Sequence, residues 1–410
     1  MRVYDKIDTV RSVKLGWLLV AAGYPAIFYV CELGKKGGLR SMLRLSFDEA
    51  KKLKEKWGTP LMVVSRREIG EKFAILNDYL PGVKMYYAVK ANAHPDVLKT
   101  VKEFTDRFDI CSPQEILAAK SIGVQSENMI HTNPVKKPED IRFAVEQGVR
   151  WFVFDNEYEL EKFKPYGSDV NLLLRLSFPN PDCVVNLSYK YGVPPDEATG
   201  LVIKAAEMGL AVRGLCFHVG SQNLNPYKYT DAIAECKRVF NSLALHGIYL
   251  DFLDIGGGFP VEYIEPIMPL RRFFSPIQEA LDSYFPNITV IAEPGRFIIG
   301  DAVNLVMTVV GKSKRNNVWW YYVDDGLYGS FSGRLYDHCD YLILSEREGP
   351  REQCIIAGPT CDSFDVIYHN TVMPQLEIGD TLIALSMGAY TAASASNFNG
   401  YPPARTVVVD

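Results

Sequence analysis

The chain has 410 residues and a formal net charge of −5, with 44 lysines and arginines against 49 aspartates and glutamates. Hydrophobic residues make up 48% and charged residues 23%, which is typical of globular proteins and excludes collagen-like and disordered chains. No block of like charges forms a basic tail, so we expect no nucleic-acid partner. The eight cysteines include no C-x-x-C pair, which predicts no metal site, no disulfide framework and a cytoplasmic protein with reduced thiols.

An apolar run at residues 15–31 raises the question of a membrane span or a signal peptide. The run is interrupted by Gly16, Gly23 and Pro25, and it is shorter than the roughly 20 apolar residues that a spanning helix needs. It also ends in aromatic residues without a small-residue cleavage site. We therefore expect no membrane association and interpret the run as two apolar strands that turn at residues 23–25.

From about residue 60, short β-branched runs alternate with stretches of helical periodicity, which is typical of βα units around a parallel sheet. Eight or nine such units, with no G-x-G-x-x-G after the first, favour a (β/α)8 barrel over an open doubly wound sheet. Helices are expected at residues 113–122, 138–147 and 196–208. The predicted strands are residues 61–65, 84–90, 108–111, 129–132, 151–154, 171–176, 212–219, 252–255 and 289–292.

After about residue 300, helical periodicity gives way to alternating strands. This pattern predicts an antiparallel β domain of the sandwich or barrel type, to which the N-terminal residues contribute further strands. The expected division is an N-terminal segment 1–57, a barrel 58–300 and a β domain 301–410. The strands predicted in the last part are residues 303–309, 318–323, 341–344, 353–356 and 380–385.

Polar residues stand where several predicted barrel strands end, and barrel enzymes place catalytic groups at that face. Lys90 ends an apolar strand, where a lysine is costly unless it is paired or used covalently. His218 ends another strand, glycines 256–258 follow the next, and Glu293 ends the last. Each has an ordinary alternative: a lysine that reaches solvent, a structural histidine, a tight turn and a surface salt bridge.

Taken together, these residues form a set that fits pyridoxal 5'-phosphate. A lysine can carry the cofactor covalently, a histidine can lie against its ring, and glycine-rich turns can approach its phosphate. A carboxylate beside the pyridine nitrogen keeps that nitrogen protonated, so the ring accepts electron pairs strongly. The sequence therefore predicts an enzyme that generates a carbanion on its substrate.

Nine short segments between about residues 60 and 405 carry a more specific signal. They are Y-Y-A-V-K-A-N (86–92), F-D-I-C-S-P-Q-E (108–115), F-H-V-G-S (217–221), D-I-G-G-G-F-P (254–260), A-E-P-G-R (292–296), Y-Y-V-D-D-G-L-Y-G-S-F (321–331), L-Y-D-H (335–338), G-P-T-C-D (358–362) and G-A-Y-T-A-A-S-A-S-N-F-N-G (388–400). In this order they resemble the ornithine decarboxylase family, the barrel-fold pyridoxal phosphate decarboxylases of ornithine, lysine, arginine and diaminopimelate.

The resemblance implies roles for individual residues. Lys90 would carry the cofactor, with Asp109 helping to orient it. His218 would lie against the ring, and Glu293 would contact the pyridine nitrogen. The other cofactor-binding residues that the resemblance implies are Arg175, Ser221, Gly258, Gly295, Arg296 and Tyr390.

The family's site is shared across a two-fold dimer, so the resemblance also implies a homodimer. Cys361 would enter the partner's site and protonate the α-carbon after carbon dioxide leaves, although by its sequence context alone it is an ordinary loop cysteine. Asp337, with Asp362 from the other chain, would hold a terminal ammonium. Tyr336 and Phe398 are the further substrate-binding residues expected.

Two short carboxylates suit a basic diamino acid and disfavour the distal carboxylate of diaminopimelate. The expected function is therefore decarboxylation of L-ornithine to putrescine, a step of polyamine biosynthesis. Lysine, both amino acids, or a modified basic amino acid are alternatives, because Arg334 adds a positive charge close to Asp337. The alternative of another class is a catalytically silent relative that binds a regulatory protein, and retention of the catalytic set argues against it.

Overall fold

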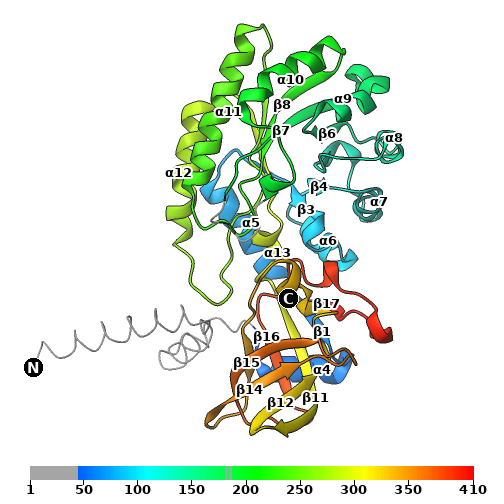
Figure 1. Ribbon diagram of the computed structural model, residues 1–410, viewed down its shortest axis with the longest axis vertical. Helices are drawn as coiled ribbons and strands as arrows, with labels where there is room; N and C mark the ends of the chain where they lie inside the picture. Colours follow the sequence, from blue (N-terminus) through cyan, green and yellow to red (C-terminus); the bar gives the residue numbers. More distant parts are fainter. Residues whose placement is uncertain (1–44, 181–182, 184–186) are drawn as a thin grey trace, which may run out of the picture.

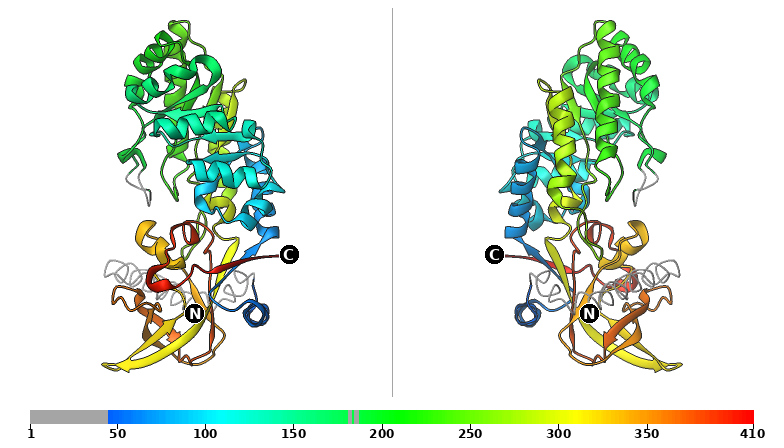
Figure 2. Two further views of the ribbon diagram at one scale, coloured as in Figure 1. Left: turned by 90° about the vertical axis from the view of Figure 1, so that its right-hand side faces the viewer. Right: turned by 90° about the vertical axis from the view of Figure 1, so that its left-hand side faces the viewer.

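The computed structural model describes residues 45–180, 183 and 187–410, and the strands expected within residues 15–31 lie outside them. A barrel and a β domain follow one another along the long axis of the molecule (Figure 1). The side views show that helices cover the outside of the barrel, whereas the β domain is mostly strands (Figure 2). In the part of the chain that is described, no helix is long and apolar enough to cross a membrane.

The wall of the barrel is a parallel sheet. Its strands are β2 (Lys84–Met85), β3 (Tyr87–Ala88), β4 (Phe108–Ile110), β5 (Met129–His131), β6 (Trp151–Phe154), β7 (Asn171–Leu176), β8 (Ala211–Phe217), β9 (Phe252–Asp254) and β10 (Thr289–Ala292). β2 pairs with β10 and β3 pairs with β4. Only Tyr86 separates β2 from β3, and its N–H donates to the Ala292 carbonyl at 2.8 Å. The two segments therefore act as one strand and close an eight-stranded barrel, which confirms the (β/α)8 prediction.

Helices surround this sheet, and local sequence signals start several of them. Ser112 and Asn156 accept backbone N–H groups as N-caps of two helices, which satisfies donors that the first helical turn leaves unpaired. The helices of the barrel are α5 (Arg66–Tyr79), α6 (Pro95–Lys102), α7 (Pro113–Ser121), α8 (Pro138–Glu146), α9 (Glu157–Phe163), α10 (Pro195–Glu207), α11 (Tyr227–Leu245), α12 (Leu270–Tyr284) and α13 (Arg296–Ile299).

The second sheet makes up the β domain. Its strands are β1 (Leu61–Ser65), β11 (Val303–Arg315), β12 (Val318–Val323), β13 (Ile343–Ser345), β14 (Arg351–Ala357), β15 (Val366–Pro374), β16 (Thr381–Ala384) and β17 (Arg405–Val409), with one short helix, α14 (Gly333–Tyr336). Most neighbours are antiparallel, as predicted, but β1 with β17 and β12 with β14 are parallel. Long connections separate the members of both pairs, and such connections permit parallel pairing. The sheet is therefore mixed.

The structure corrects one expectation about the start of the barrel. Strand β1 was expected to belong to the barrel, but it pairs with β11 of the β domain, with Leu61 opposite Val306. A short apolar run has the same pattern in either sheet, so the sequence could not assign it. The described part of the N-terminal segment forms a helix, α4 (Phe47–Trp57), and Ser46 with Glu49 forms its capping box.

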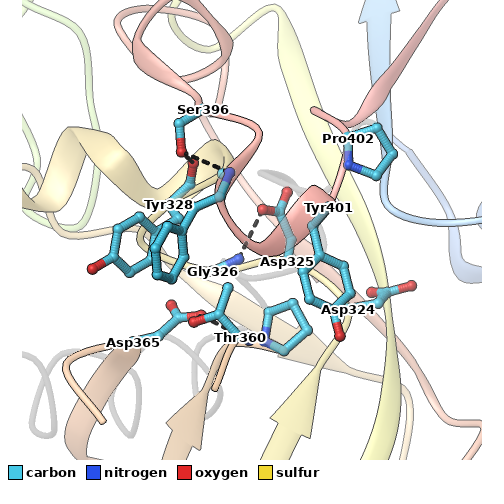
Figure 3. A pocket seen from close by; sticks show the side chains of 12 residues that line it. Asp324, Asp325, Gly326, Tyr328, Thr360, Asp365, Ser396, Tyr401 and Pro402 are labelled. Atoms are coloured by element: carbon cyan, nitrogen blue, oxygen red, sulfur yellow. Dashed lines mark hydrogen bonds between the residues drawn. The ribbon is translucent and has the colours of Figure 1, made fainter. Parts of the chain in front are cut away.

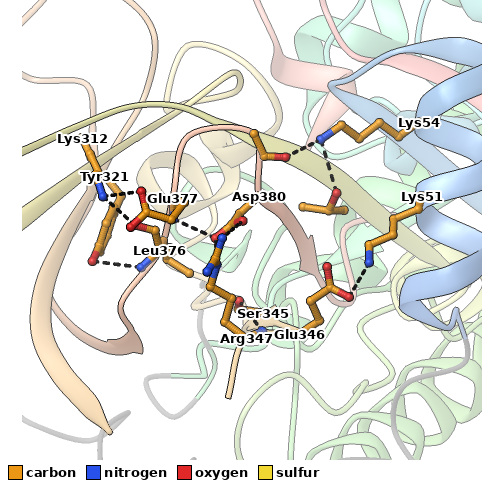
Figure 4. A network of polar contacts seen from close by, with 12 residues as sticks. Lys51, Lys54, Lys312, Tyr321, Ser345, Glu346, Arg347, Leu376, Glu377 and Asp380 are labelled. Atoms are coloured by element: carbon orange, nitrogen blue, oxygen red, sulfur yellow. Dashed lines mark hydrogen bonds and ion pairs between the residues drawn. The ribbon is translucent and has the colours of Figure 1, made fainter. Parts of the chain in front are cut away.

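Helix α4 is attached to the β domain by apolar and polar contacts. Ala50 is buried in the cluster that β1, β11 and β16 also form. Figure 4 shows the polar contacts, in which the Lys51 amine lies 2.6 Å from Glu346 and the Lys54 amine donates to the Gly379 carbonyl at 2.9 Å. Exposed pairs of this kind contribute at most about 1 kcal/mol each, so the apolar contacts dominate the attachment.

The barrel and the β domain meet where α13 leads into β11. There the N–H of Gly388 donates to the Gly300 carbonyl at 2.9 Å. The carbonyl of Gly388 accepts a hydrogen bond from the Asn92 side-chain amide at 3.1 Å. A Cβ atom at Gly388 would lie 1.8 Å from the Ile299 carbonyl oxygen, a distance at which backbone must move. The absence of a side chain at this position therefore sets how the β domain sits on the barrel mouth.

We predict that Gly388→Ala lowers the free energy of unfolding by about 1 to 3 kcal/mol, because the added methyl displaces backbone at the junction. Denaturant unfolding measures this change. Gly200→Ala is the matched control, since Gly200 lies in α10 with nothing within 4 Å of the added carbon. There alanine should be neutral or stabilise by about 0.5 to 1 kcal/mol. Equal stability of both variants and the wild type would contradict the role given to Gly388.

Candidate active site

Lys90 lies at the mouth of the barrel, in a short turn that follows β3. Its amine is 2.7 Å from Asp109 on β4 and 3.9 Å from Glu293 after β10. Burial opposes the charge of this amine, but attraction to these carboxylates, Asp109 foremost, raises the lysine pKa well above its usual value. The side chain keeps 35% of its surface exposed, so a molecule that enters the mouth can reach the amine.

Asp109 is the fixed partner of this lysine. Its side chain is fully buried, and its second carboxylate oxygen accepts the hydroxyl of Thr132 at the end of β5. Two donors from neighbouring strands therefore hold the carboxylate in one orientation. The contact between Lys90 and Asp109 brings together two residues that the family resemblance had paired.

Glu293 and Asp254 form a pair of buried carboxyls beside Lys90. Burial, followed by the negative charges of Asp109 and Asp254, raises the pKa of Glu293 well above the usual value. Burial also raises the pKa of Asp254 to about 6, although its carboxylate accepts the N–H of Gly256 at 2.8 Å. At least one proton is thus retained in this cluster near neutral pH.

His218 lies at the end of β8 and is neutral. Burial, followed by the positive charges of Arg175 and Lys90, lowers its pKa well below the usual value. Its Nδ1 atom accepts the N–H of Gly220 at 3.1 Å. This hydrogen bond leaves the ring proton on Nε2, so the imidazole carries no charge.

The glycines of the loops after β9 and β10 allow close backbone packing. A Cβ atom at Gly257 would lie 2.4 Å from the Glu293 carbonyl oxygen, and one at Gly258 would lie 2.1 Å from the Gly220 carbonyl oxygen. At Gly295 it would lie 2.9 Å from a side-chain carbon of the Lys90 turn. These glycines therefore allow the loops to approach one another closely, and this close packing brings the site residues together at one edge of the barrel.

Arg296, the first residue of α13, is the centre of a buried polar cluster. Its guanidinium donates to the Ser221 hydroxyl at 2.8 Å and to the Tyr263 hydroxyl at 2.6 Å, and it lies 2.6 Å from the carboxylate of Asp337. The ring of Tyr390 covers it, with a distance of 4.9 Å from the guanidinium carbon to the ring centroid. Residues from both domains thus meet at this guanidinium.

Cys361 and Asp362 lie in a second cluster, on the β domain. The Cys361 thiol donates to Asn399 at 3.2 Å, and Asp362 accepts the hydroxyl of Tyr328. The ring of Tyr328 stacks on Phe398 with the centroids 4.2 Å apart. Both residues line a small surface hollow, and Figure 3 shows Tyr328 at this hollow with Asp325 and Thr360. Within one described chain, the contacts of Cys361 and Asp362 are with these β-domain residues rather than with Lys90.

Arg175 and Tyr336 complete the predicted set, and Arg334 is the residue whose charge kept other substrates as alternatives. Arg175, on β7, lies over the ring of Tyr191, with 5.4 Å between the guanidinium carbon and the ring centroid. Its positive charge helps to lower the pKa of His218 at the barrel mouth. Tyr336 is 71% exposed. Arg334 pairs with Asp340, which neutralises the charge that the sequence analysis placed near the substrate segment. Arg334 therefore repels a distal ammonium of the substrate less strongly than an unpaired arginine would.

Three residues of the site were not singled out from the sequence. Asp254 and Thr132 end β9 and β5, so the rule that found Lys90 could also have found them. Tyr263 lies outside every recognised segment and follows a proline-containing loop, and no signal in the sequence pointed to it. Its place beside Arg296 is a product of the tertiary structure.

The Lys90 cluster fits pyridoxal phosphate by its chemistry. It presents a partly exposed amine, a carboxyl that retains a proton and a neutral imidazole, and the Arg296 cluster adds a guanidinium with a hydroxyl beside it. These groups match the aldehyde, ring nitrogen, ring face and phosphate of the cofactor. In the part of the chain that is described, no three histidine, cysteine, aspartate or glutamate side chains are grouped to hold a metal ion. Fold and site together define a barrel enzyme of the pyridoxal phosphate-dependent class.

Comparison with known proteins specifies the family. Residues 66–300 match the model of the pyridoxal binding domain of pyridoxal-dependent decarboxylases. The lysine/ornithine decarboxylase of Selenomonas ruminantium is 36% identical over 90% of this chain and 94% of its own, and the ornithine decarboxylase of Schizosaccharomyces pombe is 37% identical over 81% and 79%. The crystal structure of the Vibrio vulnificus lysine/ornithine decarboxylase with cadaverine has a TM-score of 0.85 at 41% identity, covering 89% of this chain and all of that one. The chain belongs to the ornithine decarboxylase family of pyridoxal phosphate-dependent decarboxylases that act on basic amino acids.

The carboxyl cluster predicts a pH dependence of stability. A raised pKa means that the folded state binds the Asp254 proton more tightly than the unfolded state, so stability falls as the pH rises from about 4 to about 6. Asp254→Asn cannot ionise. Relative to this variant, the wild type should lose up to about 3 kcal/mol of unfolding free energy across that window, at about 1.4 kcal/mol for each pKa unit. Denaturant unfolding of the cofactor-free proteins at pH 4 and pH 7 measures the difference. A constant difference at the two pH values would contradict the raised pKa.

Proposed function

We propose that the protein removes the α-carboxyl group of L-ornithine to give putrescine and carbon dioxide, in a homodimer that shares its two sites. The observation that carries this proposal is the position of the Lys90 amine, 2.7 Å from buried Asp109 and 3.9 Å from Glu293 at the barrel mouth. A structural lysine would not need a partly exposed amine among buried carboxyls. The arrangement also argues against a catalytically silent relative, which has no use for it.

Bound pyridoxal phosphate supplies an aldehyde for amines and a ring that withdraws electrons from the substrate. The residues of this chain perform the remaining tasks. Lys90 holds the cofactor and accepts it back after each turnover, and Asp109 keeps the amine in place. Glu293, with its raised pKa, shares a proton with the ring nitrogen. His218, being neutral, packs against the ring without adding a charge that would oppose that proton.

Arg296, Ser221, Gly258 and Gly295 of the barrel hold the cofactor phosphate, together with Tyr390 of the β domain. The β domain also supplies groups that act on the substrate. Cys361 and Asp362 come from the partner subunit, since their contacts in their own chain are in the second cluster. The Cys361 thiol donates a hydrogen bond to Asn399, and a proton on this sulfur is the one that transfer to the α-carbon requires.

Asp337 and Asp362 of the partner chain bind the distal ammonium of the substrate, beside Tyr336 and Phe398.

A second candidate substrate is L-lysine, because the Vibrio vulnificus relative was crystallised with cadaverine. Product analysis with ornithine, lysine, arginine and diaminopimelate offered together distinguishes the candidates. Putrescine as the main product supports ornithine, and cadaverine as the main product supports lysine.

We predict that Lys90→Ala abolishes turnover, because the lysine both holds the cofactor and takes it back after each cycle. The visible absorption of the bound cofactor should change, and borohydride should no longer attach the cofactor to the protein. Lys99→Ala is the control, since Lys99 is an exposed lysine that pairs with Asp96 on α6. It should retain full activity. Turnover by Lys90→Ala without an added amine would show that another group carries the cofactor.

A shared site predicts complementation between two inactive variants. In a mixed dimer of Lys90→Ala and Cys361→Ala subunits, one site has both residues intact. With random exchange, half of the dimers are mixed and each has one good site, so about a quarter of wild-type activity should return. Mass spectrometry verifies the exchange. No recovery after verified exchange would mean that each site is built within one chain.

A further inference from the structure

Arg296 and Asp337 form a buried ion pair between the barrel and the β domain. The guanidinium lies 2.6 Å and 2.7 Å from the two carboxylate oxygens, and the side chains are 3% and 9% exposed. The charges therefore neutralise one another out of contact with solvent. Opening such a pair is costly unless each charge receives a new partner, because a single buried charge is left uncompensated.

The proposed function gives each member of this pair a ligand group of opposite charge. Arg296 is the cation for the cofactor phosphate, and Asp337 is the anion for the distal ammonium of the substrate. While Arg296 and Asp337 neutralise each other, Arg296 attracts the phosphate less strongly and Asp337 attracts the ammonium less strongly. A phosphate alone would leave Asp337 unpaired, and an ammonium alone would leave Arg296 unpaired.

We propose that the two ligand groups exchange partners with this ion pair and so bind cooperatively. Phosphate replaces Asp337 at Arg296, and the ammonium replaces Arg296 at Asp337. Each event supplies what the other requires, so the presence of one ligand raises the affinity for the other by the same factor in both directions. This inference rests on the proposed function and adds an energetic link between the two ends of its site.

The neighbours of the pair allow such an exchange without disorder. Arg296 keeps hydrogen bonds to Tyr263 at 2.6 Å and to Ser221 at 2.8 Å when its contact with Asp337 opens. Asp337 keeps the hydrogen bond that the Cys339 thiol donates at 3.1 Å to one of its two carboxylate oxygens. Tyr263 is thus a positioning residue that holds the guanidinium at the phosphate end of the site.

Equilibrium binding to the full-length protein, freed of cofactor, tests the exchange. Pyridoxine 5'-phosphate is the phosphate probe, since it has no aldehyde and cannot react with amines, and putrescine is the ammonium probe. Saturating putrescine should raise the wild-type affinity for pyridoxine 5'-phosphate about ten- to a hundredfold, the range of one charge-assisted contact. Titration calorimetry measures both affinities.

Asp337→Asn separates the exchange from a merely structural role. The variant has no carboxylate to compete for Arg296, so pyridoxine 5'-phosphate should bind more tightly than to the wild type, and putrescine should no longer change its affinity. Asp340→Asn is the matched control, because Asp340 lies three residues away and pairs with Arg334. It should leave both affinities and their coupling unchanged.

Two results would overturn the inference. One is weaker binding of pyridoxine 5'-phosphate to Asp337→Asn, as expected if the ion pair only maintains the structure. The other is a wild-type affinity that putrescine does not change. Arg296→Gln distinguishes these failures from failure of the proposed function. If it leaves the affinity for pyridoxine 5'-phosphate unchanged, the phosphate site itself is misplaced; if it lowers that affinity, the site stands and only the exchange is refuted.

Discussion

Three carboxyls buried around one lysine are the constraint on which the site depends. Asp109 lies on β4, Asp254 ends β9 and Glu293 follows β10, and the three would repel one another strongly if all were ionised. The Lys90 ammonium neutralises part of this charge, and protons held at raised pKa values neutralise more. The lysine and the retained protons together therefore stabilise the cluster. In the proposed reaction, the same retained proton is available to a ring nitrogen.

Backbone packing fixes the positions of these side chains. The loops after β8, β9 and β10 touch through glycines at which any Cβ atom would collide with a neighbouring carbonyl. Gly388 plays the same part between the barrel and the β domain. Because these contacts are made by the main chain, they leave the side chains free to point into the mouth. A charged cluster of this kind needs such a rigid frame, since small displacements change its electrostatic energies greatly.

In the proposed function, the β domain contributes to the chemistry in two places. It gives Asp337 and Tyr390 to the barrel of its own chain through their contacts with Arg296. It also carries the second cluster, in which Cys361 and Asp362 contact Asn399 and Tyr328. Assembly of two chains offers a direct way to unite the Lys90 cluster with the second cluster. The architecture is consistent with a domain that completes sites rather than one that merely covers the barrel.

The sequence by itself determined the barrel, the location of its strands from residue 84 onward, and the residues at or just after the strand ends. Lys90, His218 and Glu293 could be recognised there because strand period and strand termini are local properties of the chain. The tertiary structure decided what local patterns cannot encode. It assigned β1 to the second sheet, gave that sheet its parallel pairs, and placed Tyr263 and Asp337 against Arg296. These outcomes depend on which distant segments meet, and that choice is made by packing over the whole chain rather than by any one segment.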